Sequence, residues 1–249
     1  MALRGPLGKT ALVIEDDPAF RRFLLPLLEA RGLTVREAGT LAEATLALAA
    51  LPERPELIVA DGMLPDGSGV DWLRALEGPV RARPILFVSA HWKGLRDHRA
   101  LLHQLAGFTA LQIVHKPVGP DAFASQLDQL LGRASAPPLP PELVRAMAQL
   151  KAEYGETLPA KLEELRLLVR AAGAAPADAQ ARRAARTAAH KLAGTAGSYG
   201  FPEESVTAAV VEAQAVQAER SDGPALAACW AVAESALNDA ILALAAPTG

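Results

Sequence analysis

The sequence predicts two fold classes in one chain, an α/β doubly wound domain with a five-stranded parallel sheet followed by an all-α four-helix bundle. Strand and helix patterns alternate five times between residues 10 and 132, which is typical of a parallel sheet covered on both faces. A proline-rich linker follows at 133–141, and strand signals stop beyond it. We therefore expect one domain at 10–132 and a second, helical domain at 142–247.

Composition restricts the class of protein. The chain has 249 residues, of which 51% are apolar and 21% charged, as in soluble globular proteins with two ordinary domains. The net charge of −3 argues against a general nucleic-acid-binding surface. Cys229 is the only cysteine, which excludes an intrachain disulfide and fits a reducing compartment. Neither a signal peptide nor an apolar run of about 18 residues is found, so we expect a cytoplasmic protein without a membrane span.

Five strands are expected, at 11–14, 33–38, 57–60, 84–88 and 110–114; most are short apolar runs, and the second, at 33–38, is the weaker signal. Placing the first strand at the centre gives the flavodoxin-like order 2-1-3-4-5. In such a sheet the carboxyl ends of neighbouring parallel strands meet at one edge. Side chains that directly follow strands one, three, four and five should therefore converge there.

Helices are expected between these strands. Asp17 followed by Pro18 predicts an N-cap and first turn for a helix that runs to about residue 30. Thr40 predicts the cap of a second helix that ends near residue 51. Three further helices are expected at 70–76, 95–106 and 121–131.

Polar side chains follow the strands that should be neighbours. Glu15 and Asp16 follow the first strand, Asp61 the third, Ser89 the fourth and Lys116 the fifth. Three carboxylates packed together repel, and a hard cation such as Mg²⁺ would relieve that repulsion. The lysine and the hydroxyl could hold the oxygens of a phosphoryl group on the third carboxylate. Each residue alone has an ordinary alternative as a turn cap or a solvated lysine, but their joint placement favours a site.

Residues 10–132 resemble the receiver domain of bacterial response regulators. Besides the acidic pair, acceptor, hydroxyl and lysine, the resemblance covers Pro65, the glycine-rich segment 66–69 and Pro117. It implies a Mg²⁺ cofactor and aspartyl phosphate chemistry. The roles that it assigns are phosphoacceptor Asp61, metal ligands Glu15, Asp16, Asp61 and the backbone carbonyl of Met63, hydroxyl Ser89, and lysine Lys116.

One position departs from this family. Members usually carry an aromatic residue three positions before the lysine, and its rotamer switches with the state of the acceptor. Here that residue is Ile113, and a β-branched side chain cannot make the same ring flip. Phosphorylation is therefore expected to alter the face formed by the fourth strand and the helix after it in a different way from other family members, or very little. His91, two residues after the serine, could influence access of hydrolytic water or be a solvated loop histidine.

Helical periodicity dominates the second half of the chain. Helices are expected at 143–154, 158–172, 178–199, 203–220 and 224–246, with Gly155 and Gly173 as breaks. The short breaks predict an antiparallel four-helix bundle with an extra leading helix.

The third of these helices carries His190 on a stripe with Arg183, Arg186, Gly194 and Gly197. Glycine inside a helix costs about 1 kcal/mol relative to alanine. The two glycines therefore either allow close helix packing or clear space beside the ring for a partner, and the second explanation predicts an exposed stripe. A lone helical histidine is usually a surface residue, but the arginines would suit an acidic docking surface or a phosphoryl group.

Residues 189–200 resemble the signature of histidine phosphotransfer (HPt) domains, with His190 in the place of the phosphorylated histidine. The two stripe glycines match the small positions of that signature. Many members have lysine three residues after the histidine, whereas this chain has Ala193, with Lys191 nearby. Which cation steadies the phosphoryl group therefore stays open. The dimerisation helices of a sensor kinase are the competing identity, but no nucleotide-binding domain follows.

The two resemblances together imply a two-component phosphorelay protein that accepts and donates phosphoryl groups without a kinase ATP-binding domain. The implied partners are a sensor histidine kinase, simple or hybrid, and the receiver domain of a response regulator, with no nucleic acid or membrane. The alternative is an interaction module whose receiver binds partners without phosphate, which Ile113 favours. A DNA-binding regulator is disfavoured, because no helix-turn-helix pattern follows residue 132. The direction of phosphoryl flow stays open, as does whether Asp61 and His190 exchange a phosphoryl group within one chain.

Overall fold

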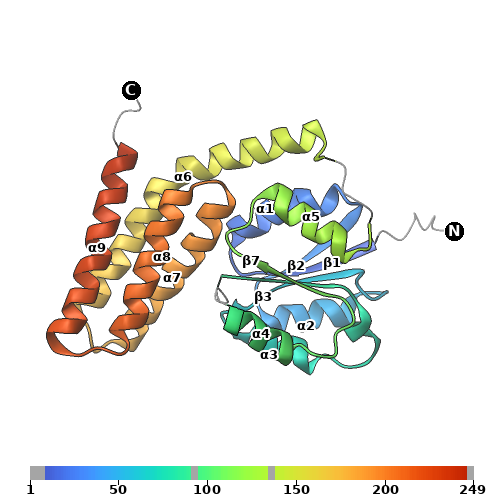
Figure 1. The fold of residues 1–249 in the computed structure, drawn as a ribbon, viewed down its shortest axis with the longest axis horizontal. Coiled ribbons are helices and arrows are strands. Elements are labelled where there is room, and N and C mark those ends of the chain that lie inside the picture. Colours follow the sequence, from blue (N-terminus) through green and yellow to red (C-terminus); the bar gives the residue numbers. More distant parts are fainter. Residues whose placement is uncertain (1–8, 91–94, 134–137, 246–249) are drawn as a thin grey trace. The chain divides into compact units, whose positions relative to one another are not determined.

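The computed structural model describes residues 9–90, 95–133 and 138–245 (Figure 1). The chain forms two compact units, which meet in the sequence between Ala148 and Gln149. Each unit is described by itself below.

The first unit is built on a five-stranded parallel sheet in the order β2-β1-β3-β6-β7, which confirms the predicted flavodoxin-like topology. The central strands are buried along most of their length because both faces of the sheet are covered. The strands are β1 (Lys9–Ile14), β2 (Leu33–Ala38), β3 (Leu57–Asp61), β6 (Ile85–Ser89) and β7 (Leu111–His115).

Helices cover the two faces unequally. Figure 1 shows α1 and α5 on one face of the sheet and α2, α3 and α4 on the other. Phe23 lies in the first layer, where its ring contacts those of Phe20 and Phe123. The helices are α1 (Pro18–Glu29), α2 (Leu41–Ala50), α3 (Gly69–Ala75), α4 (Leu95–Gln104) and α5 (Pro120–Leu130), with a short 3-10 helix at Gly78–Ala82.

Helix starts in this unit follow the predicted local chemistry. An oxygen of Asp17 accepts a hydrogen bond from the N–H of Ala19 at 2.9 Å, and the hydroxyl of Thr40 accepts from the N–H of Glu43 at 3.1 Å. Both predicted caps are confirmed.

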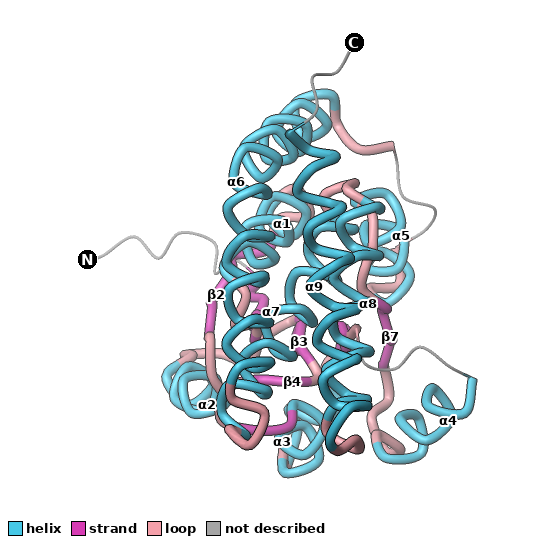
Figure 2. The backbone as a smooth tube through the Cα atoms, turned by 90° about the vertical axis from the view of Figure 1, so that its left-hand side faces the viewer, coloured by secondary structure: helices cyan, strands magenta, loops and turns pink. Residues whose placement is uncertain are grey.

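A small hairpin lies between β3 and α3, where the sequence indicates only a glycine-rich loop. It consists of β4 (Met63–Leu64) and β5 (Gly67–Ser68), paired antiparallel. Figure 2 shows β4 between α2 and α3. Two-residue strands have too short a pattern to be recognised by alternation, so this element was not predicted.

The second unit is helical, as predicted, with α6 (Pro141–Ala174), α7 (Ala179–Ser198), α8 (Pro202–Ala218) and α9 (Gly223–Ala245). The middle helix α8 packs against both α7 and α9 (Figure 2). Asp178 caps α7 by accepting from the N–H groups of Gln180 and Ala181. These helices form the bundle of this unit.

The predicted break at Gly155 is wrong, because α6 continues through Gly155 and Pro159 as one helix of 34 residues. A Cβ atom on Gly155 would lie 2.9 Å from Cζ of Phe201. The ring of Tyr154 also lies 5.9 Å from that of Phe201. The glycine therefore makes room for an aromatic side chain and does not end the helix. The expected extra leading helix is the first part of α6.

The last helix, α9, meets the length and hydropathy criterion for a membrane-spanning helix, with a mean hydropathy of 1.3. Sequence analysis looked for an uninterrupted apolar run and found none. This helix reaches the hydropathy criterion because it is rich in alanine and leucine, although it contains two charged residues, Glu234 and Asp239. The helix packs along α8 and buries Trp230 and Leu237. A core helix of a helical bundle has the same composition.

Candidate functional site

The carboxyl ends of β1, β3 and β7 bring together Glu15, Asp61 and Lys116, three of the residues singled out in the sequence. The ammonium of Lys116 donates to Oε2 of Glu15 and to Oδ2 of Asp61, each at 2.6 Å. The three residues are only 2%, 5% and 7% exposed, respectively. The chain can place them together because parallel strands end at the same edge of the sheet.

This cluster contains two buried carboxylates and one ammonium. Burial, followed by the charge of Asp61, raises the pKa of Glu15 well above its usual value. Burial also acts to raise the pKa of Asp61, but the charge and hydrogen bond of Lys116 outweigh it, so that pKa is lowered. Burial acts to lower the pKa of Lys116, and the two carboxylates raise it overall. The lysine therefore stays charged, and the raised pKa of Glu15 shows that two ionised carboxylates side by side are unfavourable here.

An aromatic ring supports the lysine from the side of α1. The ammonium of Lys116 lies 4.0 Å from the centroid of the Phe20 ring, within the range of a cation–π interaction. Sequence analysis did not single out Phe20, because nothing in its pattern distinguishes it from the other apolar residues of the predicted helix.

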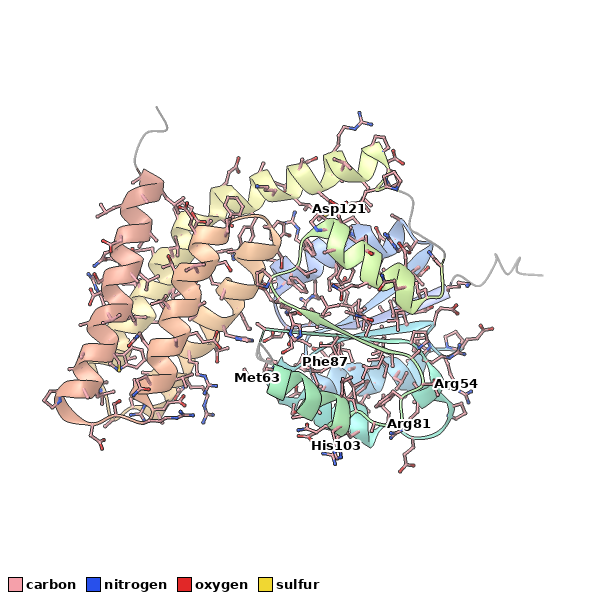
Figure 3. The ribbon with its side chains drawn as sticks, viewed as in Figure 1. Arg54, Met63, Arg81, Phe87, His103 and Asp121 are labelled. Atoms are coloured by element: carbon pink, nitrogen blue, oxygen red, sulfur yellow. The ribbon has the colours of Figure 1, made fainter. Side chains whose placement is uncertain are left out.

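The backbone after β3 also contacts the acceptor. The N–H of Met63 donates to Oδ1 of Asp61 at 3.1 Å, so each carboxylate oxygen has a different donor. Figure 3 shows Met63 at the margin of the first unit, near Phe87. Asp61 is thereby fixed by a side chain from one strand end and an amide from the following hairpin.

The structure brings two of the predicted metal ligands, Glu15 and Asp61, to one point. Among the described residues, no three carboxylate, imidazole or thiol side chains are grouped as a metal site. Lys116 contacts both Glu15 and Asp61. Asp16, which follows Glu15 in the sequence, is half-buried. The donor chemistry nevertheless suits Mg²⁺, because carboxylate and carbonyl oxygens are its preferred ligands. A divalent cation beside these oxygens would relieve the repulsion between the carboxylates when both are ionised.

Ser89 ends β6 and is buried, and its carbonyl accepts from the backbone N–H of Lys116 at 3.1 Å. A Cβ atom on Gly62 would lie 2.8 Å from the Ser89 hydroxyl and 3.0 Å from Cζ of Phe87. Gly62 therefore lets the loop, the hydroxyl and the ring approach closely, a role that the sequence did not show. Ile113 pairs with Phe87 across the sheet and is buried. The other residue considered near this end, His91, lies outside the described residues.

In the second unit, His190 lies on α7 and its ring turns toward α8. Nδ1 of His190 lies 3.0 Å from Oε1 of Glu212. Glu212 was not predicted, because it lies 22 positions away on another helix and only the packing of α8 against α7 brings it to the ring. If the carboxylate accepts a proton held on Nδ1, Nε2 is the nitrogen with the lone pair.

The prediction of an exposed stripe is wrong. His190 is 8% exposed, Gly194 is buried and Gly197 is half-buried. The ring lies against α8 because Glu212 binds its Nδ1 atom. The stripe therefore does not extend freely into solvent.

The basic residues on α7 have different surroundings. The guanidinium of Arg186 donates to both carboxylate oxygens of Glu219, at 3.1 and 3.2 Å, so part of the predicted basic margin is neutralised within the unit. Arg183 is exposed and Lys191 is half-buried.

The position at which many HPt domains carry lysine is closed in this chain. Ala193 is buried, and its carbonyl accepts from the Ser205 hydroxyl at 2.6 Å. A small side chain suits this buried position.

Comparison with known proteins covers both units. Residues 11–128 match the family model of the response regulator receiver domain, and residues 149–246 match that of the Hpt domain. The KDP operon transcriptional regulatory protein KdpE of Escherichia coli (strain K12) is 37% identical over 134 residues, 54% of this chain and 56% of that protein. The transcriptional regulatory protein KdpE of Mycobacterium tuberculosis (strain ATCC 25618 / H37Rv) is 38% identical over 125 residues, 50% of this chain and 52% of that protein.

Among solved structures, the non-phosphorylated HemR receiver domain from Leptospira biflexa is 26% identical, with a TM-score of 0.43. The match covers 51% of this chain and 98% of that structure. The chain spans about half the length of the curated relatives named here.

Proposed function

Because the chain is a response regulator receiver domain followed by an Hpt domain, we propose that it is a phosphorelay protein that carries phosphoryl groups at Asp61 and His190. The two domains belong to two-component signalling. The observation that carries the residue assignment is the buried ammonium of Lys116 between the carboxylates of Glu15 and Asp61.

At the receiver, a carboxylate oxygen of Asp61 attacks the phosphorus of a phosphohistidine on the donor. The new O–P bond forms as the N–P bond breaks, and the imidazole of the donor leaves with its electron pair. Lys116 neutralises charge on the phosphoryl oxygens, and Ser89 supplies a hydroxyl donor at the same sheet edge. Glu15, Asp16, Asp61 and the carbonyl of Met63 would hold Mg²⁺. When bound, that ion supplies additional charge neutralisation.

At the Hpt domain, Nε2 of His190 attacks the phosphorus of an aspartyl phosphate. The N–P bond forms as the O–P bond breaks, and the donor carboxylate leaves. The carboxylate of Glu212 accepts a hydrogen bond from the N–H at Nδ1 and stabilises the positive charge that develops on the ring.

The partners that this chemistry requires are a histidine kinase, or another phosphohistidine donor, and a receiver aspartate. We propose a cytoplasmic location, where both partners act. The protein itself is an acceptor and donor of the phosphoryl group. Exchange between Asp61 and His190 of one chain is a separate possibility that the labelling experiment below can distinguish by mixing variants.

The test is radiolabelled transfer from a partner kinase to the full chain and to two variants. Asp61→Asn should remove the base-sensitive acyl phosphate and keep the base-stable label. His190→Gln should remove the base-stable label and keep the base-sensitive one. Labelling that is unchanged in both variants would reject both assignments. Transfer between a chain with only Asp61 intact and one with only His190 intact would show that the two sites exchange phosphoryl groups between chains, and its absence would leave exchange within one chain as the only route between them.

One observation favours a second candidate function for the receiver. Ile113 replaces the aromatic switch residue, so the receiver could bind partners without using phosphate. The discriminating measurement is Mg²⁺-dependent binding of beryllofluoride, a phosphoryl mimic. A receiver that accepts phosphate should bind it and lose this binding in Asp61→Asn, whereas a pure interaction module should not bind it.

A further inference from the structure

The hairpin that follows the phosphoacceptor is attached to a neighbouring helix by one side chain. Asp66 lies between β4 and β5, at the tip of the hairpin. Its Oδ1 accepts from the N–H of Leu41 at 2.9 Å, and its Oδ2 accepts from the N–H of Ala42 at 3.0 Å. These are the first two residues of α2. Each oxygen of the carboxylate thus binds a different backbone donor.

The other N–H groups at the start of α2 are satisfied from within the helix. The Thr40 hydroxyl accepts from Glu43, and the Thr40 carbonyl accepts from Ala44 at 3.0 Å. The first four N–H groups of an α-helix have no carbonyl partner within the helix, so other acceptors must satisfy them. Here a residue 25 positions away supplies the acceptor for two of them, so the end of α2 depends on Asp66 as well as on Thr40.

Backbone pairing connects the hairpin tip with the acceptor. Met63 pairs with Ser68, and Leu64 pairs with Gly67. At the base, the N–H of Gly69 donates to the carbonyl of Gly62 at 3.1 Å. A Cβ atom on Gly69 would lie only 1.9 Å from the Asp61 carbonyl, which shows how closely the base is packed. The hairpin is therefore fixed at its base by the backbone and at its tip by Asp66.

We propose that Asp66 is a positioning residue for the phosphoacceptor site. By fastening the hairpin tip to α2, it keeps Met63 in place, and Met63 in turn contacts Asp61 through its N–H and offers its carbonyl to Mg²⁺. The proposal rests on the proposed function, since it concerns the same site. Without the carboxylate, the tip loses both hydrogen bonds to α2 and keeps only weaker packing against Leu41, so the backbone beside Asp61 is held mainly from its base.

The test compares Asp66→Ala with Thr40→Ala in the full chain. Both variants remove a cap of α2, but Asp66 also hydrogen-bonds that helix from the hairpin, which Thr40 does not, so Thr40→Ala controls for loss of helix stability. Mg²⁺ affinity is measured by titration calorimetry. Amide hydrogen exchange of Met63 is followed by NMR without Mg²⁺. We expect Asp66→Ala to weaken Mg²⁺ binding by about tenfold, a loss typical of residues that orient metal ligands, and to accelerate exchange at Met63.

Thr40→Ala should leave both measurements close to those of the natural chain. Asp66→Asn retains one carbonyl acceptor and should give intermediate values, and it replaces Asp66→Ala if that variant does not fold. Unchanged Mg²⁺ affinity and Met63 exchange in the Asp66 variants would overturn the proposal, as would equal losses in Thr40→Ala. Failure of the natural chain to bind Mg²⁺ would instead contradict the proposed function, and the exchange of Met63 would still decide the role of Asp66.

Discussion

Replacing Lys116 with methionine should destabilise the first unit strongly at neutral pH. Lys116→Met keeps an unbranched side chain against the Phe20 ring but removes the ammonium that contacts Glu15 and Asp61 at 2.6 Å each. Removing one partner of a buried ion pair typically costs about 3–5 kcal/mol, because a buried charge is left uncompensated. Two carboxylates are left here, so we expect a loss within that range at pH 7.

The loss should shrink as the pH falls. Without Lys116, burial and mutual repulsion place the folded-state pKa values of both Glu15 and Asp61 above their unfolded values. A carboxyl group with a raised folded-state pKa contributes stability that is fully present below its unfolded pKa of about 4 and is lost as pH rises through the folded value. Lys116→Met should therefore be more stable at pH 5 than at pH 7.

The assay is urea unfolding at both pH values, followed by amide NMR signals of the sheet so that the two units are separated. Lys9→Met is the matched control, because Lys9 forms a salt bridge to Glu56 in which the side chains are 60% and 36% exposed. An exposed pair contributes about 0–1 kcal/mol, so this control should change little. A loss of less than about 1 kcal/mol in Lys116→Met, or stability that increases with pH, would refute the reasoning.

Three further changes test other contacts. Gly155→Ala should destabilise the bundle although alanine gains about 1 kcal/mol in helix propensity, because its Cβ atom would lie 2.9 Å from the Phe201 ring; a higher melting temperature would contradict this. Gly62→Ala should cost about 1–3 kcal/mol in urea unfolding, because the new methyl group would lie 2.8 Å from the serine hydroxyl at the end of β6. Glu212→Gln should slow phosphoryl transfer to His190 by roughly tenfold in single-turnover assays with helicity unchanged, because the ring loses a charged acceptor; an unchanged rate would reject its role.

Local signals in the sequence were sufficient for most of the first unit. Uninterrupted apolar runs located β1, β3 and β6, since a strand buried on both faces has no polar alternation, whereas β2 and β7 gave weaker signals. The caps at Asp17 and Thr40 were predictable because a cap depends only on residues two or three positions away. Sheet order followed from the regular alternation of strands and helices.

The features that sequence analysis missed depend on contacts between distant residues. Gly155 has the composition of a helix break, and only its contact with Phe201 explains why α6 continues through it. Glu212 reaches His190 through the packing of two helices, and the same contact turned the ring away from the exposed position that the glycine stripe suggested. Asp66 looked like one residue of a turn, whereas its bonds to α2 join parts of the chain 25 positions apart.

The unequal number of acids and bases beneath the receiver surface makes the folding equilibrium of this unit sensitive to its ionic surroundings. A divalent ion that binds the native carboxylates and ignores the unfolded chain adds about 1.4 kcal/mol of stability for each tenfold excess of free ion over its Kd. Because a single lysine contacts both carboxylates, a bound cation could add to the stability of the folded state. The thermal stability of the receiver would then report magnesium concentration even when no phosphoryl donor is present.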